Sequence, residues 1–290
     1  MYRVTETVCG AALHRHNSKW LPFKYDINVY RGCAHRCVYC YALYSHQYIG
    51  GGDFYQQIYA KTNIADVLRH ELPRFARELV NLGGVTDSYQ PAEKECRLMP
   101  GVLELLARFG VPAVISTKSA LILRDAELLK QVAEAGGLTA ALSITTMDAS
   151  VASLIEPGSP PPSERMAAVA GLKKHGLVCG VHVMPVIPYL TSDADSLEAV
   201  FRRAKDAGAD YVLTSALNLK GPTKRGFFDG IREGFPSEYR RITALYRDAN
   251  AYRAYKKALH DSVAQLRSKY AMPAYIRAAE KQTVTQISFF

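Results

Sequence analysis

From about residue 24 onward, the chain alternates short runs rich in β-branched residues with longer stretches whose apolar residues recur every three or four positions. This alternation is typical of βαβ units, in which helices connect parallel strands. Six strands are expected at residues 24–30, a run closing near Thr86, 111–117, 138–145, 177–186 and 209–215. The connecting helices are expected at residues 64–79, 125–135, 163–175 and 196–207.

Six parallel units joined by right-handed crossovers favour an α/β fold that curls into a partial (βα)6 TIM-like barrel, with a flat doubly wound sheet as the alternative. We expect an N-terminal extension at residues 1–25, the partial barrel at 26–220 and a C-terminal helical region packed on it at 221–290. Within that region, residues 221–241 are predicted to be irregular and residues 237–269 to form two helices. The prolines of residues 156–162 predict a loop, because proline has no amide hydrogen to donate.

The composition and the charge limit which classes of protein the chain can belong to. No apolar run approaches the roughly 20 residues that a membrane helix needs, and the first residues lack a signal-peptide pattern, so we expect a cytoplasmic protein with no membrane partner. The 36 Lys and Arg exceed the 27 Asp and Glu, which gives a net charge of +9. This excess suits a polyanionic partner such as nucleic acid, although a solvated basic surface explains it as well.

Three of the six cysteines lie within eight residues, in the stretch VYRGCAHRCVYCYA directly after the first expected strand. Cys33, Cys37 and Cys40 have the spacing C-x3-C-x2-C. A loop at the mouth of a barrel can place three thiolates around one iron-sulfur cluster, and a cubane with only three cysteine ligands leaves one iron open. Zinc is the alternative, but its loops normally show paired ligands, and His35 lies inside the loop with poor reach to a metal.

This motif resembles that of the radical S-adenosylmethionine (radical SAM) superfamily, in which the loop follows the first strand of a six-unit partial barrel. Within it, the chain is most similar to the spore photoproduct lyase-like branch, often described as DNA repair photolyase-related. The supporting residues are 39–41 (YCY), 116–119 (STKS), 143–145 (SIT) and 156–188, which begin EPGSPPPSERM.

The resemblance implies a [4Fe-4S] cluster whose open iron binds S-adenosyl-L-methionine. An electron from the reduced cluster then yields methionine and a 5'-deoxyadenosyl radical, which abstracts hydrogen from a substrate. It also implies a reduced flavodoxin or ferredoxin-type protein as electron donor. The chemistry would be lyase-like or transferase-like.

The resemblance also suggests residues for the cofactor. The backbone of Tyr39 is expected near the adenine, with its ring as an alternative shield over the cluster. Lys118 is expected to pair with the methionyl carboxylate, and Ser143 to bind the carboxylate or ribose. Thr86 and Asp87 stand nearest the place of the family's glycine-glycine-glutamate motif, which this chain matches only approximately.

Tyr41 matches a tyrosine of the lyase branch, so it is the candidate catalytic residue, either relaying a hydrogen atom or simply packing; packing is expected. The branch's hydrogen-donating cysteine is missing, because residues 84–87 contain no thiol and Cys96 lies about ten residues later. Cys179, in an expected strand, is interpreted as a small apolar residue. The cluster and cofactor are therefore carried over, but the thymine-dimer substrate is not.

A nucleic acid or nucleotide remains a candidate substrate. Residues 14–19 with Trp20, and residues 220–225 with Phe227 and Phe228, combine basic and aromatic side chains that suit phosphate contact and base stacking. The competing hypothesis is an iron-sulfur or zinc protein that binds nucleic acid without turnover. Electron transfer alone is disfavoured, because a carrier normally saturates its irons with protein ligands.

Overall fold

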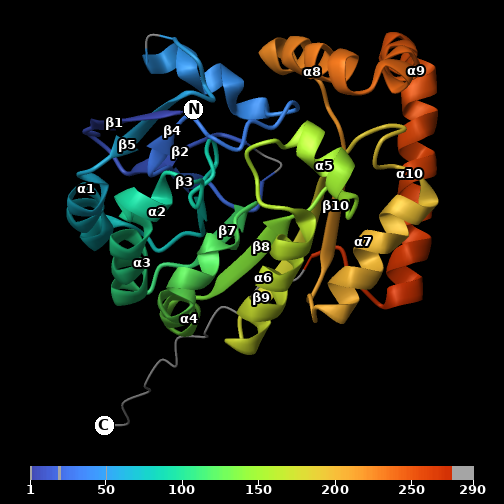
Figure 1. The fold of residues 1–290 in the computed structure, drawn as a ribbon. Coiled ribbons are helices and arrows are strands. Elements are labelled where there is room, and N and C mark those ends of the chain that lie inside the picture. Colours follow the sequence, from blue (N-terminus) through green and yellow to red (C-terminus); the bar gives the residue numbers. More distant parts are fainter. Residues whose placement is uncertain (1, 19–20, 50, 276–290) are drawn as a thin grey trace.

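The computed structural model describes residues 2–18, 21–49 and 51–275. Its main sheet has seven strands in the order β10-β9-β8-β7-β6-β3-β2, and β10 and β2 form its two open edges (Figure 1). The strands are β2 (Leu13–Arg15), β3 (Tyr25–Ile27), β6 (Val80–Leu82), β7 (Ala113–Thr117), β8 (Leu138–Ser143), β9 (Val178–Val186) and β10 (Val212–Ala216). The last six are parallel, and β2 runs antiparallel to β3.

The order of these strands confirms the predicted fold class. From β3 to β10, neighbours in the sheet follow one another along the chain, as in a barrel, whereas a doubly wound sheet reverses direction at a switch point. The expected six strands are all present. The second one ends at Leu82 rather than near Thr86, because Gly83 has a φ of +92° and turns the chain out of the sheet.

The helices between the parallel strands cover the outer face of the sheet, except α5, which lies beyond the strand ends and contacts α8 (Figure 1). They are α1 (Ile64–Glu71), α2 (Glu93–Cys96), α3 (Leu98–Phe109), α4 (Ala126–Ala135), α5 (Ala149–Ile155), α6 (Pro162–Lys174) and α7 (Ala194–Asp206), with the 3-10 turns η2 (Leu72–Arg74) and η3 (Ala120–Asp125). Strands β8 and β9 are buried over most of their length, as expected for parallel strands covered on both faces.

A small second sheet lies beside the open edge formed by β2. Its order is β1-β5-β4, with β1 (Arg3–Thr7), β5 (Gln57–Lys61) and β4 (Tyr30–Arg31). Strand β5 pairs in parallel with β1 and antiparallel with β4. Between β4 and β5 runs the 3-10 segment η1 (Tyr41–Ile49). Residues before 25 thus supply one strand to each sheet.

Three helices follow the barrel: α8 (Gly221–Gly234), α9 (Pro236–Arg247) and α10 (Ala249–Tyr270). Helix α10 packs on α7 and β10, while α8 packs on η1. The two helices expected within residues 237–269 are present, but the prediction that residues 221–241 are irregular is wrong. Gly226 and Gly230 weaken a helix, yet here they allow close packing: a Cβ on Gly230 would lie 2.8 Å from Cγ1 of Val38.

Candidate functional site

The cysteine loop, residues 32–40, directly follows β4 and lies beneath α8 (Figure 1). Gly32 opens it with a φ of +79°, and a Cβ at this position would overlap the carbonyl oxygen of Gln57, so only glycine fits the turn. Cys33 and Cys37 are buried, Cys40 is half-buried, and all three are free thiols. One loop therefore presents three unpaired thiols in a largely dry environment.

The chemistry of these thiols fits a metal cluster. Burial raises the pKa of Cys33 and Cys40, and it raises the pKa of Cys37 to about 12. A buried thiolate is stable only beside strong positive charge, which bound iron supplies when it deprotonates its cysteine ligands. No group of three or more His, Cys, Asp or Glu side chains surrounds a single-ion position among the described residues. The ligands of a cubane bind different irons, so they need not converge on one point.

The segment after β6 forms the floor of the cysteine loop. Thr86 donates from Oγ1 to the carbonyl oxygen of Gly32 at 2.7 Å. The buried amide of Gln90 donates to the same carbonyl at 3.0 Å and accepts the N–H of Ala34 at 2.9 Å. Thr86 and Gln90 thus satisfy the backbone of the loop on both sides of Cys33.

Asp87 occupies the centre of this floor. Its carboxylate accepts hydrogen bonds from Thr117 Oγ1 at 2.6 Å and from the Lys118 N–H at 2.8 Å, and its Oδ2 lies 3.1 Å from Nε2 of His35. Burial would raise the pKa of Asp87, but His35 and these hydrogen bonds outweigh burial and hold it well below its usual range. Thr86 and Asp87 therefore both contact the polypeptide that carries the cysteines.

A buried ion pair supports the other side of the loop. Oε2 of Glu156 lies 2.5 Å from Nη1 of Arg165, and both side chains are almost fully buried. Tyr39 donates its hydroxyl to Oε1 of Glu156, and Thr145 donates to the same atom at 3.2 Å. Burial would raise the pKa of Glu156, but Arg165 and Lys118 lower it, so the carboxylate stays charged. The side chain of Tyr39, which lies between Cys37 and Cys40 in the sequence, is thereby fixed.

Backbone hydrogen bonds also join residues 155–158 to the cysteine loop. Val38 donates its N–H to the Ile155 carbonyl at 3.0 Å, and Gly158 donates its N–H to the His35 carbonyl at 2.9 Å. Nδ1 of His35 lies 3.1 Å from the Gly158 carbonyl oxygen. A Cβ on Gly158 would overlap the carbonyl oxygen of Ala34, so a glycine is required for this approach. We call residues 155–158 the clasp.

Lys118 and Ser143 lie at the ends of neighbouring strands, β7 and β8. The Lys118 ammonium lies 5.5 Å from the ring centroid of Tyr39, and although burial would lower its pKa, Cys37 and Glu156 raise it. Oγ of Ser143 lies 3.1 Å from Oγ of Ser116, which lies 3.1 Å from Nδ1 of His182. The predicted cofactor residues thus gather at the carboxyl ends of the strands beside the cysteines.

The side chain of Tyr41 was expected to pack against the protein interior, but the structure shows it largely exposed. Its side chain is 63% exposed, and its hydroxyl donates to the carbonyl oxygen of Gly84. The residue begins η1, where the chain leaves the cysteine loop, so its ring is not drawn into the core. Tyr41 therefore lies next to Cys40 in sequence, and its side chain is held at Gly84 rather than packed in the core.

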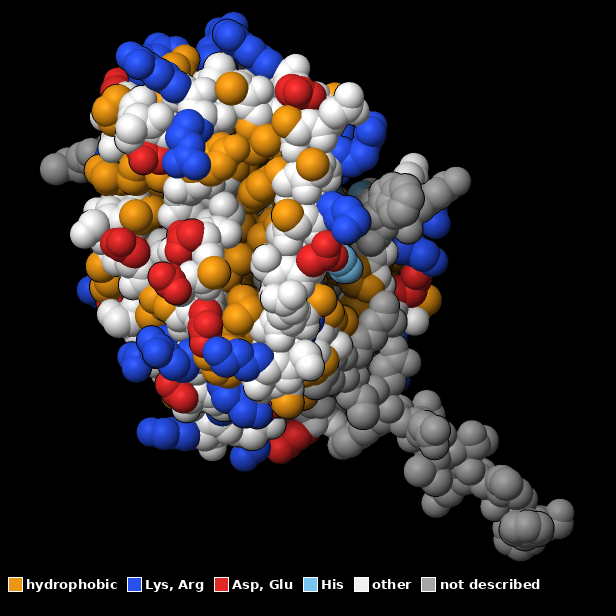
Figure 2. Space-filling model, turned by 90° about the vertical axis from the view of Figure 1, so that its right-hand side faces the viewer, with side chains coloured by type: hydrophobic (Ala, Val, Ile, Leu, Met, Phe, Trp, Pro, Cys, Tyr) orange, Lys and Arg blue, Asp and Glu red, His pale blue; other side chains and the backbone are white. Residues whose placement is uncertain are grey.

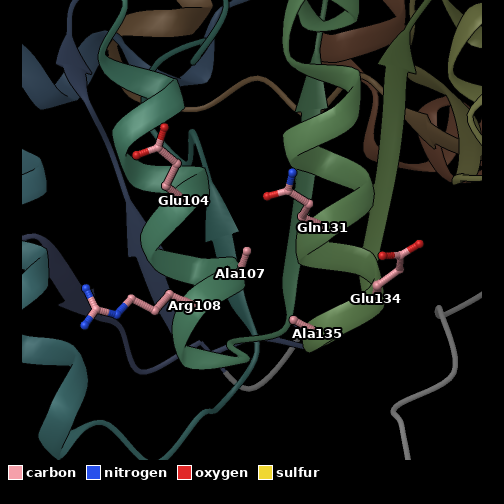
Figure 3. A pocket seen from close by; sticks show the side chains of 6 residues that line it. All are labelled: Glu104, Ala107, Arg108, Gln131, Glu134 and Ala135. Atoms are coloured by element: carbon pink, nitrogen blue, oxygen red, sulfur yellow. The ribbon is translucent and has the colours of Figure 1, made fainter.

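One hollow of the structure is remote from this site. It has a volume of about 500 Å³ and lies between α3 and α4 (Figure 3). Its lining residues are Glu104, Ala107, Arg108, Gln131, Glu134 and Ala135. The ends of these helices meet the amino ends of the strands, opposite the cysteine loop, so this hollow is not the candidate site.

The comparisons with known proteins agree with this geometry. The sequence model of the radical SAM superfamily matches residues 27–200, which include the whole cysteine loop, the floor and the clasp. The chain belongs to the radical SAM superfamily. Membership implies an enzyme that uses S-adenosylmethionine and a [4Fe-4S] cluster, and that needs a reductant.

Two relatives of this radical SAM protein share most of its length. An uncharacterized protein of Mycobacterium tuberculosis is 38% identical over 285 residues, which cover 96% of this chain and 84% of the relative. An uncharacterized protein of Methanocaldococcus jannaschii is 27% identical, covering 76% of this chain and 80% of the relative. Neither name states an activity.

Solved structures show the same fold. Spore photoproduct lyase complexed with dinucleoside spore photoproduct has a TM-score of 0.61 at 18% identity, covering 81% of this chain and 66% of the lyase. Streptococcus suis SuiB bound to S-adenosylmethionine has a TM-score of 0.50 at 14% identity, covering 78% of this chain and 48% of SuiB. The chain spans just under two thirds of the lyase, and the similarity concerns the fold alone.

Sequence reasoning identified the cysteines but missed the residues that hold them. Residues 156–162 were expected only as a loop, whereas Glu156 and Gly158 form the clasp and Arg165 completes it. Gln90 also binds two backbone groups of the loop. The sequence does place a glutamate just before Pro-Gly and an arginine nine residues later. This spacing did not predict a buried ion pair, because charged side chains are normally exposed.

Proposed function

We propose that this chain is a radical SAM enzyme that holds a [4Fe-4S] cluster on Cys33, Cys37 and Cys40. When bound, the cluster supplies one electron to S-adenosylmethionine, which yields methionine and a 5'-deoxyadenosyl radical that removes a hydrogen atom from a substrate. The observation that carries this proposal is the single loop of three free thiols, two of them buried and one half-buried, fixed on one side by Thr86 and Gln90 and on the other by the clasp. A protein that only binds nucleic acid, without turnover, would not need a cluster that three cysteines leave with one open iron.

The chain's own residues then have positioning tasks. Lys118, held near Tyr39, is suited to pair with a carboxylate, and Ser143 offers a hydroxyl at the next strand end. Asp87 and Thr86 orient the loop from beneath, and the backbone of Tyr39 is available beside the buried ring. Helix α8 covers the loop: Thr223 donates to the Cys40 carbonyl at 3.0 Å, and Gly230 packs on Val38. This cover limits access of water to the thiols.

The experiment that tests this function measures the products of the cofactor. Anaerobically reconstituted protein, reduced with dithionite, is expected to form 5'-deoxyadenosine and methionine from S-adenosylmethionine. The Cys37→Ala variant is expected to form neither, whereas Cys179→Ala, which alters a buried cysteine outside the loop, retains both. Absence of 5'-deoxyadenosine from cluster-loaded protein would support a binding protein without turnover.

For the substrate, we propose a nucleic acid or nucleotide that reaches the site past η1 and α8. Three exposed tyrosines line η1, with exposed fractions of 63% for Tyr41, 41% for Tyr44 and 68% for Tyr48. Exposed basic residues follow on α8 and α9: Lys224, Arg225, Arg232, Arg240, Arg241 and Arg247. Figure 2 shows Lys and Arg side chains gathered toward the upper and lower ends of one face, and α8 and α9 lie at the upper end. Aromatic rings beside cations suit stacking and phosphate contact.

This substrate class has its own test. A fluorescent single-stranded oligonucleotide is expected to bind with a steep salt dependence, and Tyr48→Ala is expected to weaken it by about 1–3 kcal/mol through lost stacking. Tyr2→Ala, which changes a tyrosine in the N-terminal region, is the matched control. Equal affinities for both variants and wild type would remove nucleic acid from the candidates. A reduced flavodoxin or ferredoxin-type protein is the proposed electron donor, because such acidic carriers suit a chain with net charge +9.

A further inference from the structure

Four basic side chains gather where β2, β4, β5 and η1 meet, outside the site described above. They are His14 of β2, Arg31 of β4, His46 of η1 and Lys61 of β5. Lys61 and His46 are 5% and 3% exposed, whereas His14 and Arg31 are half-buried. Two of these basic side chains are thus buried, and the other two are partly exposed.

The strand register explains why these groups face one another. In the β4/β5 ladder, Arg31 lies opposite Tyr59, and Lys61 donates its N–H to the carbonyl of Val29. Side chains two residues apart on a strand share a face, so Arg31, Tyr59 and Lys61 lie on the same side of the small sheet. The ring of His46 lies 6.0 Å from that of Tyr59, which places it over this same side.

These basic groups lack counter-ions. Among the described residues, no carboxylate lies within 4 Å of His14, Arg31, His46 or Lys61, and the ammonium of Lys61 has no hydrogen-bond acceptor. Nε2 of His14 is buried without a hydrogen-bond partner. Two carboxylates lie near His14. Glu71 accepts the N–H groups of Ala12 and Leu13, and Asp26, opposite His14 in the β2/β3 ladder, accepts the side-chain amide of Asn81 at 2.7 Å.

The arrangement is electrostatically costly without an anion. Burial and the neighbouring Arg31 lower the pKa of Lys61 to about 8, and burial, Lys61 and Arg31 lower the pKa of His14. Burial raises the pKa of the adjacent Cys9 thiol, which therefore stays neutral near pH 7 and offers no counter-charge. Buried charges are normally paired, and an unpaired one destabilises the fold.

We propose that His14, Arg31 and Lys61 form a binding site for a phosphate-type oxyanion. Arg31 is half-buried and donates to the Ser45 carbonyl at 3.5 Å, Lys61 is buried, and His14 contributes a buried Nε2 with no hydrogen-bond partner. Arginine offers a planar pair of donors and lysine a point charge, the combination that phosphate oxygens accept. Because Arg31 directly precedes Gly32 and the cysteine loop, a bound phosphate would lie at the strand that leads into that loop. The proposal does not depend on the proposed radical chemistry.

The test measures binding of inorganic phosphate to the intact protein. We expect the melting temperature of wild-type protein to rise with phosphate concentration, relative to chloride at equal ionic strength, because the anion binds only the folded state. Lys61→Met is expected to raise the melting temperature in chloride, since it removes a buried unpaired charge, and to weaken phosphate binding by about tenfold or more. Lys24→Met, which removes an exposed lysine, is the matched control. It is expected to change neither the melting temperature in chloride nor the affinity for phosphate.

A second variant and a competition experiment complete the design. Arg31→Gln changes a half-buried residue and is expected to weaken phosphate binding as Lys61→Met does. Displacement of a bound oligonucleotide by inorganic phosphate in wild type, but not in Lys61→Met, would assign the site to a nucleic-acid phosphate. Phosphate binding without displacement would assign it to a free phosphate or nucleotide. A phosphate response that is absent, or equal in all four proteins, would overturn the proposal, and none of these readings involves cluster or cofactor.

Discussion

Glu156 and Arg165 form a buried ion pair, 2.5 Å between Oε2 and Nη1, that ties the end of α5 to the first turn of α6. Through Oε1, the same carboxylate accepts the hydroxyl of Tyr39, between the second and third cysteines. Arg165 is further satisfied by the carbonyls of Pro160 and Ser143, at 2.7 and 3.0 Å. A pair with this many hydrogen bonds fixes the cysteine loop relative to β8.

Removing one partner of this ion pair is expected to lower the free energy of unfolding. Glu156→Gln leaves the guanidinium of Arg165 buried without its counter-charge, so urea unfolding should show a loss of about 3–5 kcal/mol. The double variant Glu156→Gln with Arg165→Met should lose less than the single one, because no uncompensated charge remains. Asp66→Asn, which breaks an exposed pair with Arg69, is the control and should change the stability by less than about 1 kcal/mol. Equal losses for Glu156→Gln and Asp66→Asn would contradict this account.

Gly158→Ala is expected to displace the cysteine loop while leaving the barrel folded. The added methyl group would overlap the Ala34 carbonyl oxygen, which lies between Cys33 and His35 in the chain. We expect an unchanged far-ultraviolet circular dichroism spectrum and a reduced iron content after anaerobic reconstitution. Gly10→Ala, at a glycine with open space around it, should retain the wild-type iron content. Full iron content in Gly158→Ala would show that the clasp does not position the cluster ligands.

Lys118→Met is expected to separate cluster binding from cofactor binding. The cluster should form normally, because Lys118 is not a ligand, but binding of S-adenosylmethionine should weaken by about tenfold or more through loss of a charge-assisted hydrogen bond. The cofactor concentration that half-converts the electron paramagnetic resonance spectrum gives this affinity. Lys130→Met, at an exposed position on α4, should bind the cofactor as wild type does. Wild-type affinity in Lys118→Met would remove this residue from the cofactor site.

His182 is expected to make the stability depend on pH. Burial, followed by the charge of Lys118, lowers its pKa to about 4, whereas an unfolded histidine titrates near 6.5. Between these values the unfolded state binds more protons, so the unfolding free energy rises with pH and is lost as pH falls from about 6.5 to 4. The full effect is at most about 3 kcal/mol. Ser116, Tyr211 and Lys118 face this ring.

The control for this pH dependence is an exposed histidine. Urea titrations at several pH values should show a shallower slope between pH 4 and 6.5 for His182→Gln than for wild type. His260→Gln, on the exposed side of α10, should keep the wild-type slope. Identical slopes for all three proteins would mean that His182 is solvated in the folded state.

The sequence predicted the barrel because its signals were local. Each parallel strand is an apolar run bounded by turn residues, and the strand order then followed from right-handed crossovers. The helix at residues 221–234 was missed because Gly226 and Gly230 reduce helix propensity. The close packing of Gly230 on Val38 appears only when segments almost 200 residues apart meet.

The candidate site, too, could be predicted only where its residues are close together in the sequence. The three cysteines are recognisable because their spacing lies within one loop. The residues that hold this loop are distant in sequence: Gln90, Glu156 and Arg165 lie 57 to 132 residues beyond Cys33. Lys61 looks like an ordinary surface lysine in the sequence, and only the pairing of β4 with β5 shows that it faces Arg31.

The most direct test of the central claim is electron paramagnetic resonance of the reduced protein after anaerobic reconstitution, with and without S-adenosylmethionine. We expect a [4Fe-4S] signal whose shape changes when the cofactor is added, because Cys33, Cys37 and Cys40 leave one iron free to bind it. A spectrum that is the same with and without the cofactor, or protein that carries zinc in place of iron, would contradict the account.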